Sequence, residues 1–199
     1  MTKGCLFSSL GVMVFVIFLL SSGAYAEKNP DPRIAKYHWT YLAGYGVTHP
    51  GWGDTKVTVE TIDFIVRYGR FLTENIGSSW YRGRHEILIE LPIHMVVSPD
   101  VSPMVGINFL ACWTFTSSEK AIPYFFAGGG PLYTNAEIPG LGSKINGNYQ
   151  AGIGTYYKLK QGLYLNAEYR IHHISNAGTK EPNDPLNSSK FLIGVSLFN

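Results

Sequence analysis

Hydrophobic and polar side chains alternate along most of the chain from residue 37 to its end, which is the pattern of β-strands. The alternation is clearest within residues 80–96. One face of this segment carries His85, Ile87, Ile89, Leu91, Ile93 and Met95. The other face carries Glu86, Glu90 and His94. The segment is therefore predicted to be a strand with one apolar and one polar face.

Eight segments of this kind are predicted, with no long amphipathic helix between them. Turns rich in Gly, Pro, Ser and Asp divide them into residues 38–49, 57–72, 80–96, 104–116, 122–132, 149–159, 163–175 and 191–198. Irregular alternation around Asp63 is compatible with a β-bulge there. Eight antiparallel strands joined in chain order can close into an up-and-down barrel, which removes the exposed sheet edges.

Three consecutive glycines, Gly128, Gly129 and Gly130, interrupt the fifth predicted strand. Glycine-rich runs can bind phosphate, but a phosphate loop needs a following helix and a lysine, and this run has neither. Close approach of a neighbouring backbone, or a kink in the barrel wall, explains the three glycines better.

Alternation alone does not distinguish a soluble barrel from a membrane barrel, which carries its polar residues inside. Two features favour the membrane barrel. The seventh strand has a continuous polar row, formed by Asn166, Glu168, Arg170 and His172. Aromatic residues lie near strand ends, as an aromatic girdle would: Trp39, Trp80, Tyr81, Trp113, Tyr124, Tyr156 and Tyr157. The last strand also resembles the terminal strand of outer-membrane barrels, although Phe198 is followed by Asn199.

The first 26 residues have the features of a cleaved signal peptide. Lys3 supplies a positive charge, residues 10–20 are apolar apart from Gly11, and residues 24–26 form a small-x-small cleavage site. The apolar run is short for a membrane-anchoring helix, which needs about 20 residues. We therefore predict a signal peptide at 1–26, a lead-in at 27–36 and one barrel domain at 37–199, located in the outer membrane.

Composition excludes several classes of function. The formal net charge is only +2, which argues against a nucleic-acid partner. Cys112 is the only cysteine after the predicted signal peptide, so no internal disulfide is expected, and its side chain should be buried or lipid-facing. His38, His85 and His94 lack the spacing of metal ligands, so we predict no metal site and no cofactor.

The polar chemistry of the chain is concentrated around His173 and Ser175, at the end of the seventh strand. Residues i and i+2 of a strand point the same way and lie about 6.5–7 Å apart at Cα. The two side chains can therefore form a hydrogen bond, in which the imidazole acts as base for a serine nucleophile. His172 points to the opposite face, where we expect it in an internal polar network.

The sequence around this pair resembles the outer-membrane lipid A 3-O-deacylase (PagL-type, acyloxyacyl hydrolase) family. The resemblance rests on the stretch His173-Ile174-Ser175-Asn176-Ala177-Gly178, followed by Pro182-Asn183-Asp184 before the last strand. It implies a serine esterase that hydrolyses the ester-linked 3-hydroxyacyl chain of lipid A. Ser175 would be the nucleophile, His173 the base and Asn183 an oxyanion donor. We add the backbone amide of Asn176 as a second donor.

The sequence departs from the family pattern at Asn187, where the resemblance leads us to expect a glutamate as third member of a triad. Three alternatives follow. Asn187 can orient His173, as in Cys-His-Asn enzymes, but without stabilising the imidazolium by charge. Glu181 or Asp184 can supply the missing acid. Finally, this copy can be inactive.

A lipid substrate explains why His173 and Ser175 end an apolar face. If that face contacts the membrane, the ester of a bilayer lipid reaches the pair directly, and Tyr169 and Ile171 line the path of its acyl chain. Two alternatives remain open: a non-enzymatic structural or adhesive outer-membrane barrel, and a soluble periplasmic lipid-binding barrel. The sequence does not decide whether the chain forms homo-oligomers.

Overall fold

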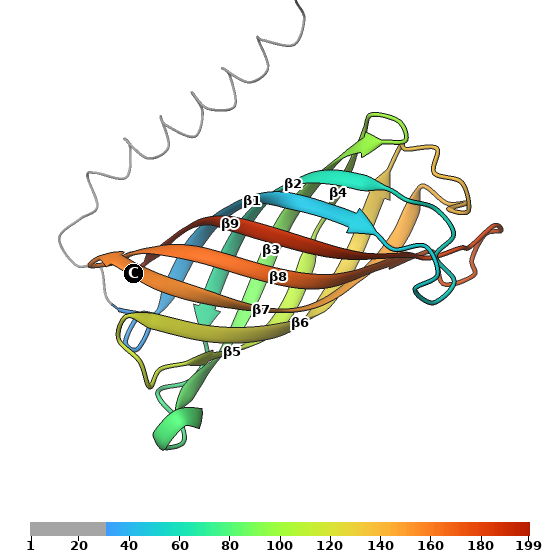
Figure 1. Ribbon diagram of the computed structural model, residues 1–199. Helices are drawn as coiled ribbons and strands as arrows, with labels where there is room; N and C mark the ends of the chain where they lie inside the picture. The colour runs from blue at the N-terminus through green and yellow to red at the C-terminus, as the bar shows by residue number, and fades with distance from the viewer. Residues whose placement is uncertain (1–30) are drawn as a thin grey trace, which may run out of the picture.

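The computed structural model describes residues 31–199, so the predicted signal peptide and the first residues of the lead-in lie outside the described part. These described residues form nine strand segments (Figure 1). They are β1 (Tyr37–Thr48), β2 (Glu60–Phe71), β3 (Gly83–Ser98), β4 (Ser102–Gly106), β5 (Asn108–Phe115), β6 (Ala121–Thr134), β7 (Ile145–Lys160), β8 (Leu163–Ser175) and β9 (Leu186–Phe198). A short 3₁₀ turn, η2 (Ser79–Tyr81), precedes β3.

The sheet closes because β1 pairs antiparallel with both β2 and β9. The segments β4 and β5 both lie between β3 and β6, so together they occupy one of eight positions around the barrel. The sequence prediction of a single fourth strand missed the break between them at Ile107, whose N–H donates to the carbonyl of Pro131. The predicted eight-stranded antiparallel barrel is otherwise confirmed.

Charged side chains fill the barrel interior, and apolar side chains cover its outside. Arg67, Glu90, Glu168 and Arg170 are all fully buried. Arg67 donates to Glu90 and to Glu168 at 2.8 and 2.6 Å, and Arg170 donates to Glu90 at 2.8 Å. Exposed outer residues include Phe64, Leu91, Phe109, Ile153 and Phe191. This distribution is that of a membrane barrel, so the soluble alternative is wrong.

Other residues in the interior correct or confirm individual predictions. Tyr124 and Tyr156 are buried inside the barrel and stack on each other at 4.4 Å, so they do not belong to an aromatic girdle. Cys112 is buried and not lipid-facing. Asp63 sits in regular pairing and bonds to Lys190 and His94. The register irregularity of β2 lies instead between Glu60 and Thr61.

The glycines of β6 allow close backbone approach, as the sequence predicted. A Cβ atom on Gly128 would lie 2.2 Å from the carbonyl oxygen of Phe109, and one on Gly130 would lie 1.9 Å from that of Ile107. The backbones of β5 and β6 therefore exclude any side chain at these positions.

The two ends of the barrel are closed differently. At one end the segment before β1 meets the C-terminus: Lys36 N–H donates to the carbonyl of Asn199, and Arg84 donates to the carbonyls of Pro32 and Ala35 (Figure 1). At the other end, the loops contribute to a buried apolar cluster of Val59, Val96, Met104, Leu132, Ile138, Leu141, Ile174 and Leu186. No helix within residues 31–199 is long and apolar enough to cross a membrane.

Candidate active site

His173 and Ser175 lie on the outer face of β8, at the end of the barrel opposite the C-terminus. His173 Nε2 is 3.0 Å from Ser175 Oγ, which is hydrogen-bonding distance. Both side chains are half-buried. His173 pairs in register with Tyr149 of β7, and the two rings are 6.2 Å apart. The predicted pair is thus formed, with an aromatic ring beside it.

Asn187 lies directly opposite His173 in the neighbouring strand. The sequence placed it in the polar turn, but β9 begins at Leu186, and Asn187 pairs in register with His173. Asn187 Oδ1 is 2.7 Å from His173 Nδ1. Ser175, His173 and Asn187 therefore form one continuous hydrogen-bonded chain across the outer surface of β8 and β9.

The loop between β1 and β2 holds the other side of Asn187. Asn187 Nδ2 lies 2.9 Å from the carbonyl oxygen of Trp52 and 2.9 Å from Thr55 Oγ1. The backbone N–H of Asn187 also donates to Thr55 Oγ1. The sequence reasoning missed these two residues, because loop residues more than 130 positions away carry no local signal for this contact.

Asn176 and Asn183 are joined to each other at the mouth of the barrel. The backbone N–H of Asn176 donates to Asn183 Oδ1 at 2.9 Å, so this amide is engaged in the structure. The Asn183 side chain retains its Nδ2 group as a donor. The β6–β7 loop braces this segment, since Asn183 forms an isolated bridge with Leu141 and Gly142 N–H donates to Pro182.

The two acidic candidates do not contact His173 in the described structure. Asp184 Oδ1 is paired with Lys56 Nζ at 2.7 Å, and the hydrogen bond and charge of this carboxylate raise the pKa of Lys56. Glu181 is exposed in the β8–β9 loop. The geometry therefore favours Asn187 over either acid as the partner of His173 Nδ1.

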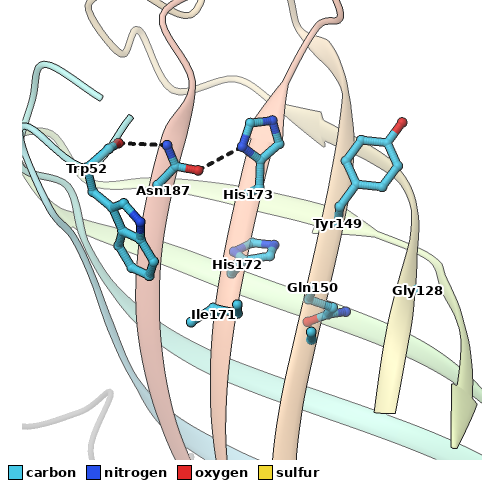
Figure 2. Close-up of a pocket in the computed structure, with 9 residues that line it drawn as sticks. Trp52, Gly128, Tyr149, Gln150, Ile171, His172, His173 and Asn187 are labelled. Atoms are coloured by element: carbon cyan, nitrogen blue, oxygen red, sulfur yellow. Dashed lines mark hydrogen bonds between the residues drawn. The ribbon is translucent and has the colours of Figure 1, made fainter. Parts of the chain in front are cut away.

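A groove of about 340 Å³ runs along the outer wall beside His173. Figure 2 shows Trp52 at one side of it and Tyr149 at the other, with His173 and Asn187 between them. Ile171 and Ala151, which pair in register below His173, also line it. Tyr169 is exposed two residues further along β8 and is not part of the lining. The groove walls are largely apolar, which suits a hydrocarbon chain.

His172 points into the barrel, as predicted, where it bonds to Asn148. Within residues 31–199, no group of three or more His, Cys, Asp or Glu side chains is arranged to hold a metal ion.

Comparison with known proteins then decides the family. The family model for lipid A 3-O-deacylase (PagL) matches residues 40–196, which includes every residue of the site. The chain belongs to the lipid A 3-O-deacylase family. Members of this family are carboxylic ester hydrolases that act on lipid A in the outer membrane. No curated protein sequence matches this chain.

Solved structures support the fold of this family member. The crystal structure of the outer-membrane enzyme PagL matches with a TM-score of 0.58 at 16% identity, covering 80% of this chain and 98% of the other. Neisserial surface protein A matches with a TM-score of 0.59 at 13% identity, covering 81% and 96%. OprG from Pseudomonas aeruginosa matches at 0.51 and 12%, covering 87% and 99%. All three are outer-membrane or surface proteins, in agreement with a barrel that spans the outer membrane.

Proposed function

We propose that this lipid A deacylase is a serine esterase in which Ser175 is the nucleophile and His173 the general base. The observation that carries the proposal is the hydrogen-bonded chain from Ser175 through His173 to Asn187, placed on the lipid-facing wall. A serine hydroxyl is a weak nucleophile until a neighbouring base accepts its proton. The imidazole Nε2, 3.0 Å from Oγ, is in position to do so.

The reaction proceeds in two halves. Ser175 Oγ attacks the carbonyl carbon of the ester-linked 3-hydroxyacyl chain, and its proton passes to His173 Nε2. The tetrahedral intermediate collapses, the sugar oxygen leaves with the proton from His173, and the acyl group stays on Ser175. Water, activated by His173, then attacks the acyl-enzyme and releases the 3-hydroxy fatty acid. No cofactor takes part in these steps.

The Asn183 side chain is the proposed oxyanion donor. Its Oδ1 accepts a hydrogen bond from the Asn176 N–H, so this contact does not use its Nδ2 donor group. Since the Asn176 amide is already engaged, the proposal assigns the donor role to the Asn183 side chain. A donor aimed at a developing oxyanion typically contributes about 2.7–4 kcal/mol to transition-state stabilisation.

The location of the pair explains how a bilayer lipid reaches it. His173 and Ser175 lie on the wall that contacts lipid, and the groove lined by Ile171 and Ala151 leads along the barrel from His173. An acyl chain packed in this groove would bring its ester to the end of β8 without leaving the membrane. The groove would thus hold the ester next to Ser175 in a fixed geometry, which lowers the entropic cost of bringing the two reactants together.

The test is a mass spectrum of lipid A from cells that express the protein, compared with Ser175→Ala. Ser117→Ala, an exposed serine in the turn at the opposite end of the barrel, is the matched control. We expect loss of one hydroxyacyl chain with the unaltered protein and with Ser117→Ala, and no loss with Ser175→Ala. Full deacylation by a folded Ser175→Ala protein would overturn the assignment of the nucleophile.

A further inference from the structure

The orientation of the Asn187 side chain is determined by its contact with Trp52. Oxygen and nitrogen of an asparagine amide are assigned from their hydrogen-bond partners. A main-chain carbonyl can only accept a hydrogen bond, and that of Trp52 lies 2.9 Å from Nδ2 of Asn187. The flipped amide would place two acceptors against each other. The amide nitrogen therefore faces the loop, and the oxygen faces His173 (Figure 2).

This orientation determines which nitrogen of His173 carries the proton. Asn187 Oδ1 can only accept, so His173 Nδ1, 2.7 Å away, must be the donor. In the neutral ring Nε2 is then unprotonated and can accept from Ser175. The wrong tautomer would present an N–H group to the Ser175 hydroxyl and could not act as base. Removing such control of the tautomer in a serine protease lowers kcat about 10⁴-fold.

Thr55 is the side chain that completes this arrangement. It is buried, with 3% of its surface exposed, and its Oγ1 accepts from both Nδ2 and the backbone N–H of Asn187. The loop around it is tied down, because Gly51 N–H donates to the Thr55 carbonyl and His49 N–H donates to the Asn187 carbonyl. The loop therefore contacts Asn187 through backbone and side chain together.

We propose that Thr55, acting with the main-chain carbonyl of Trp52, is a positioning residue that locks the Asn187 amide and so sets the tautomer of His173. The inference rests on the proposed serine esterase function and deepens it. It also explains how asparagine serves at a position where the family resemblance suggests glutamate. The Trp52 carbonyl needs a donor opposite it, and an amide provides one, whereas an ionised carboxylate does not.

The test compares Thr55→Val, which removes the hydroxyl but keeps the shape, with Thr55→Ser, which keeps the hydroxyl. The full-length proteins are purified in detergent and treated with an alkyl fluorophosphonate. In this reaction Ser175 Oγ bonds to phosphorus, fluoride leaves, and His173 takes the proton. The rate of adduct formation at Ser175 is followed by mass spectrometry. This rate measures the reactivity of Ser175 with His173 as its base, independently of the lipid substrate. Rates are normalised to the folded fraction seen as the heat-modifiable band on a gel.

Thr55→Val removes two hydrogen bonds, of which only the one from Asn187 Nδ2 orients the amide. We therefore expect the labelling rate and kcat for lipid A to fall by about tenfold, the typical effect of one hydrogen bond. KM should stay within about twofold, because Thr55 does not line the groove. Thr55→Ser should restore most of the rate. A folded Thr55→Val protein that is labelled as fast as the unaltered protein would overturn the inference.

A double variant separates a positioning role from a general one. Adding Thr55→Val to Asn187→Ala should cause no further loss of labelling rate, because Thr55 acts only through Asn187. If the double variant loses the product of the two single losses, Thr55 acts independently of Asn187, and the proposal is contradicted. If the unaltered protein deacylates lipid A but is never labelled at Ser175, the serine mechanism itself fails, which distinguishes that outcome from failure of the Thr55 inference.

Discussion

Asn187 and His173 face each other across β8 and β9 in one register pair, and Asn187 Oδ1 lies 2.7 Å from His173 Nδ1. The contact is made on the outer wall, where the side chains of paired residues in adjacent strands project the same way. In the proposed mechanism, an uncharged residue therefore orients the base. It can fix the ring and its tautomer, but it does not neutralise an imidazolium.

Replacing Asn187 with alanine should lower kcat strongly and leave the barrel folded. The substitution removes the acceptor for His173 Nδ1, so both tautomers become accessible. Losses of about 10⁴-fold accompany a wrong tautomer in a serine protease, and we expect a loss of at least about 10²-fold here. The measurement is the deacylation rate of purified variants on lipid A in mixed micelles. Unchanged activity would show that Asn187 does not orient the base.

The donor role of Asn183 can be separated from its role in the loop. Asn183→Ala should lower kcat by about 10²–10³-fold, the usual effect of losing one oxyanion donor. Asn183→Asp keeps an acceptor for the Asn176 N–H but replaces the donor by a carboxylate oxygen. If the side chain serves as donor, the aspartate variant will be at least as impaired as the alanine variant. An active aspartate variant would assign Asn183 to loop structure alone.

Filling the groove should block the acyl chain without touching the hydrogen-bonded chain of the site. Ala151 is the small residue of the lining that pairs with Ile171. Ala151→Phe should lower the rate at low substrate concentration about tenfold, with labelling of Ser175 by a small fluorophosphonate preserved. Ile93→Phe, on the outer face of β3 away from the groove, is the control. Equal effects of the two variants would contradict the proposed path.

The charged interior should matter for stability more than for catalysis. Arg170 donates to Glu90 and Gln150, and it also contacts Glu168 within the barrel. Arg170→Met breaks the buried ion pairs with Glu90 and Glu168 and leaves Arg67 to neutralise both carboxylates. Breaking a buried ion pair typically costs about 3–5 kcal/mol. We expect a lower midpoint of urea unfolding in detergent and a deacylation rate within about twofold of the unaltered protein under native conditions. An unchanged midpoint would show that water replaces the guanidinium without loss.

Alternation of side chains was sufficient to predict the strands and the antiparallel barrel, because a strand of period two has only two faces. The hydrogen bond between His173 and Ser175 was also predictable, since residues i and i+2 of one strand are neighbours whatever the rest of the chain does. Alternation did not say which face of the sheet lies inside. The placement of charges inside was predicted only by combining the polar rows in residues 80–96 and 163–175 with the aromatic residues near strand ends and the predicted signal peptide.

Tertiary structure alone decided the rest of the site. The pairing of Asn187 with His173 depends on the register of β8 and β9, which the intervening loop does not reveal in its sequence. The contacts of Trp52 and Thr55 with Asn187 exist because the barrel closes between β1 and β9, which brings together residues 135 and 132 positions apart. Sequence patterns encode local geometry, whereas register and closure arise only when all the strands pair.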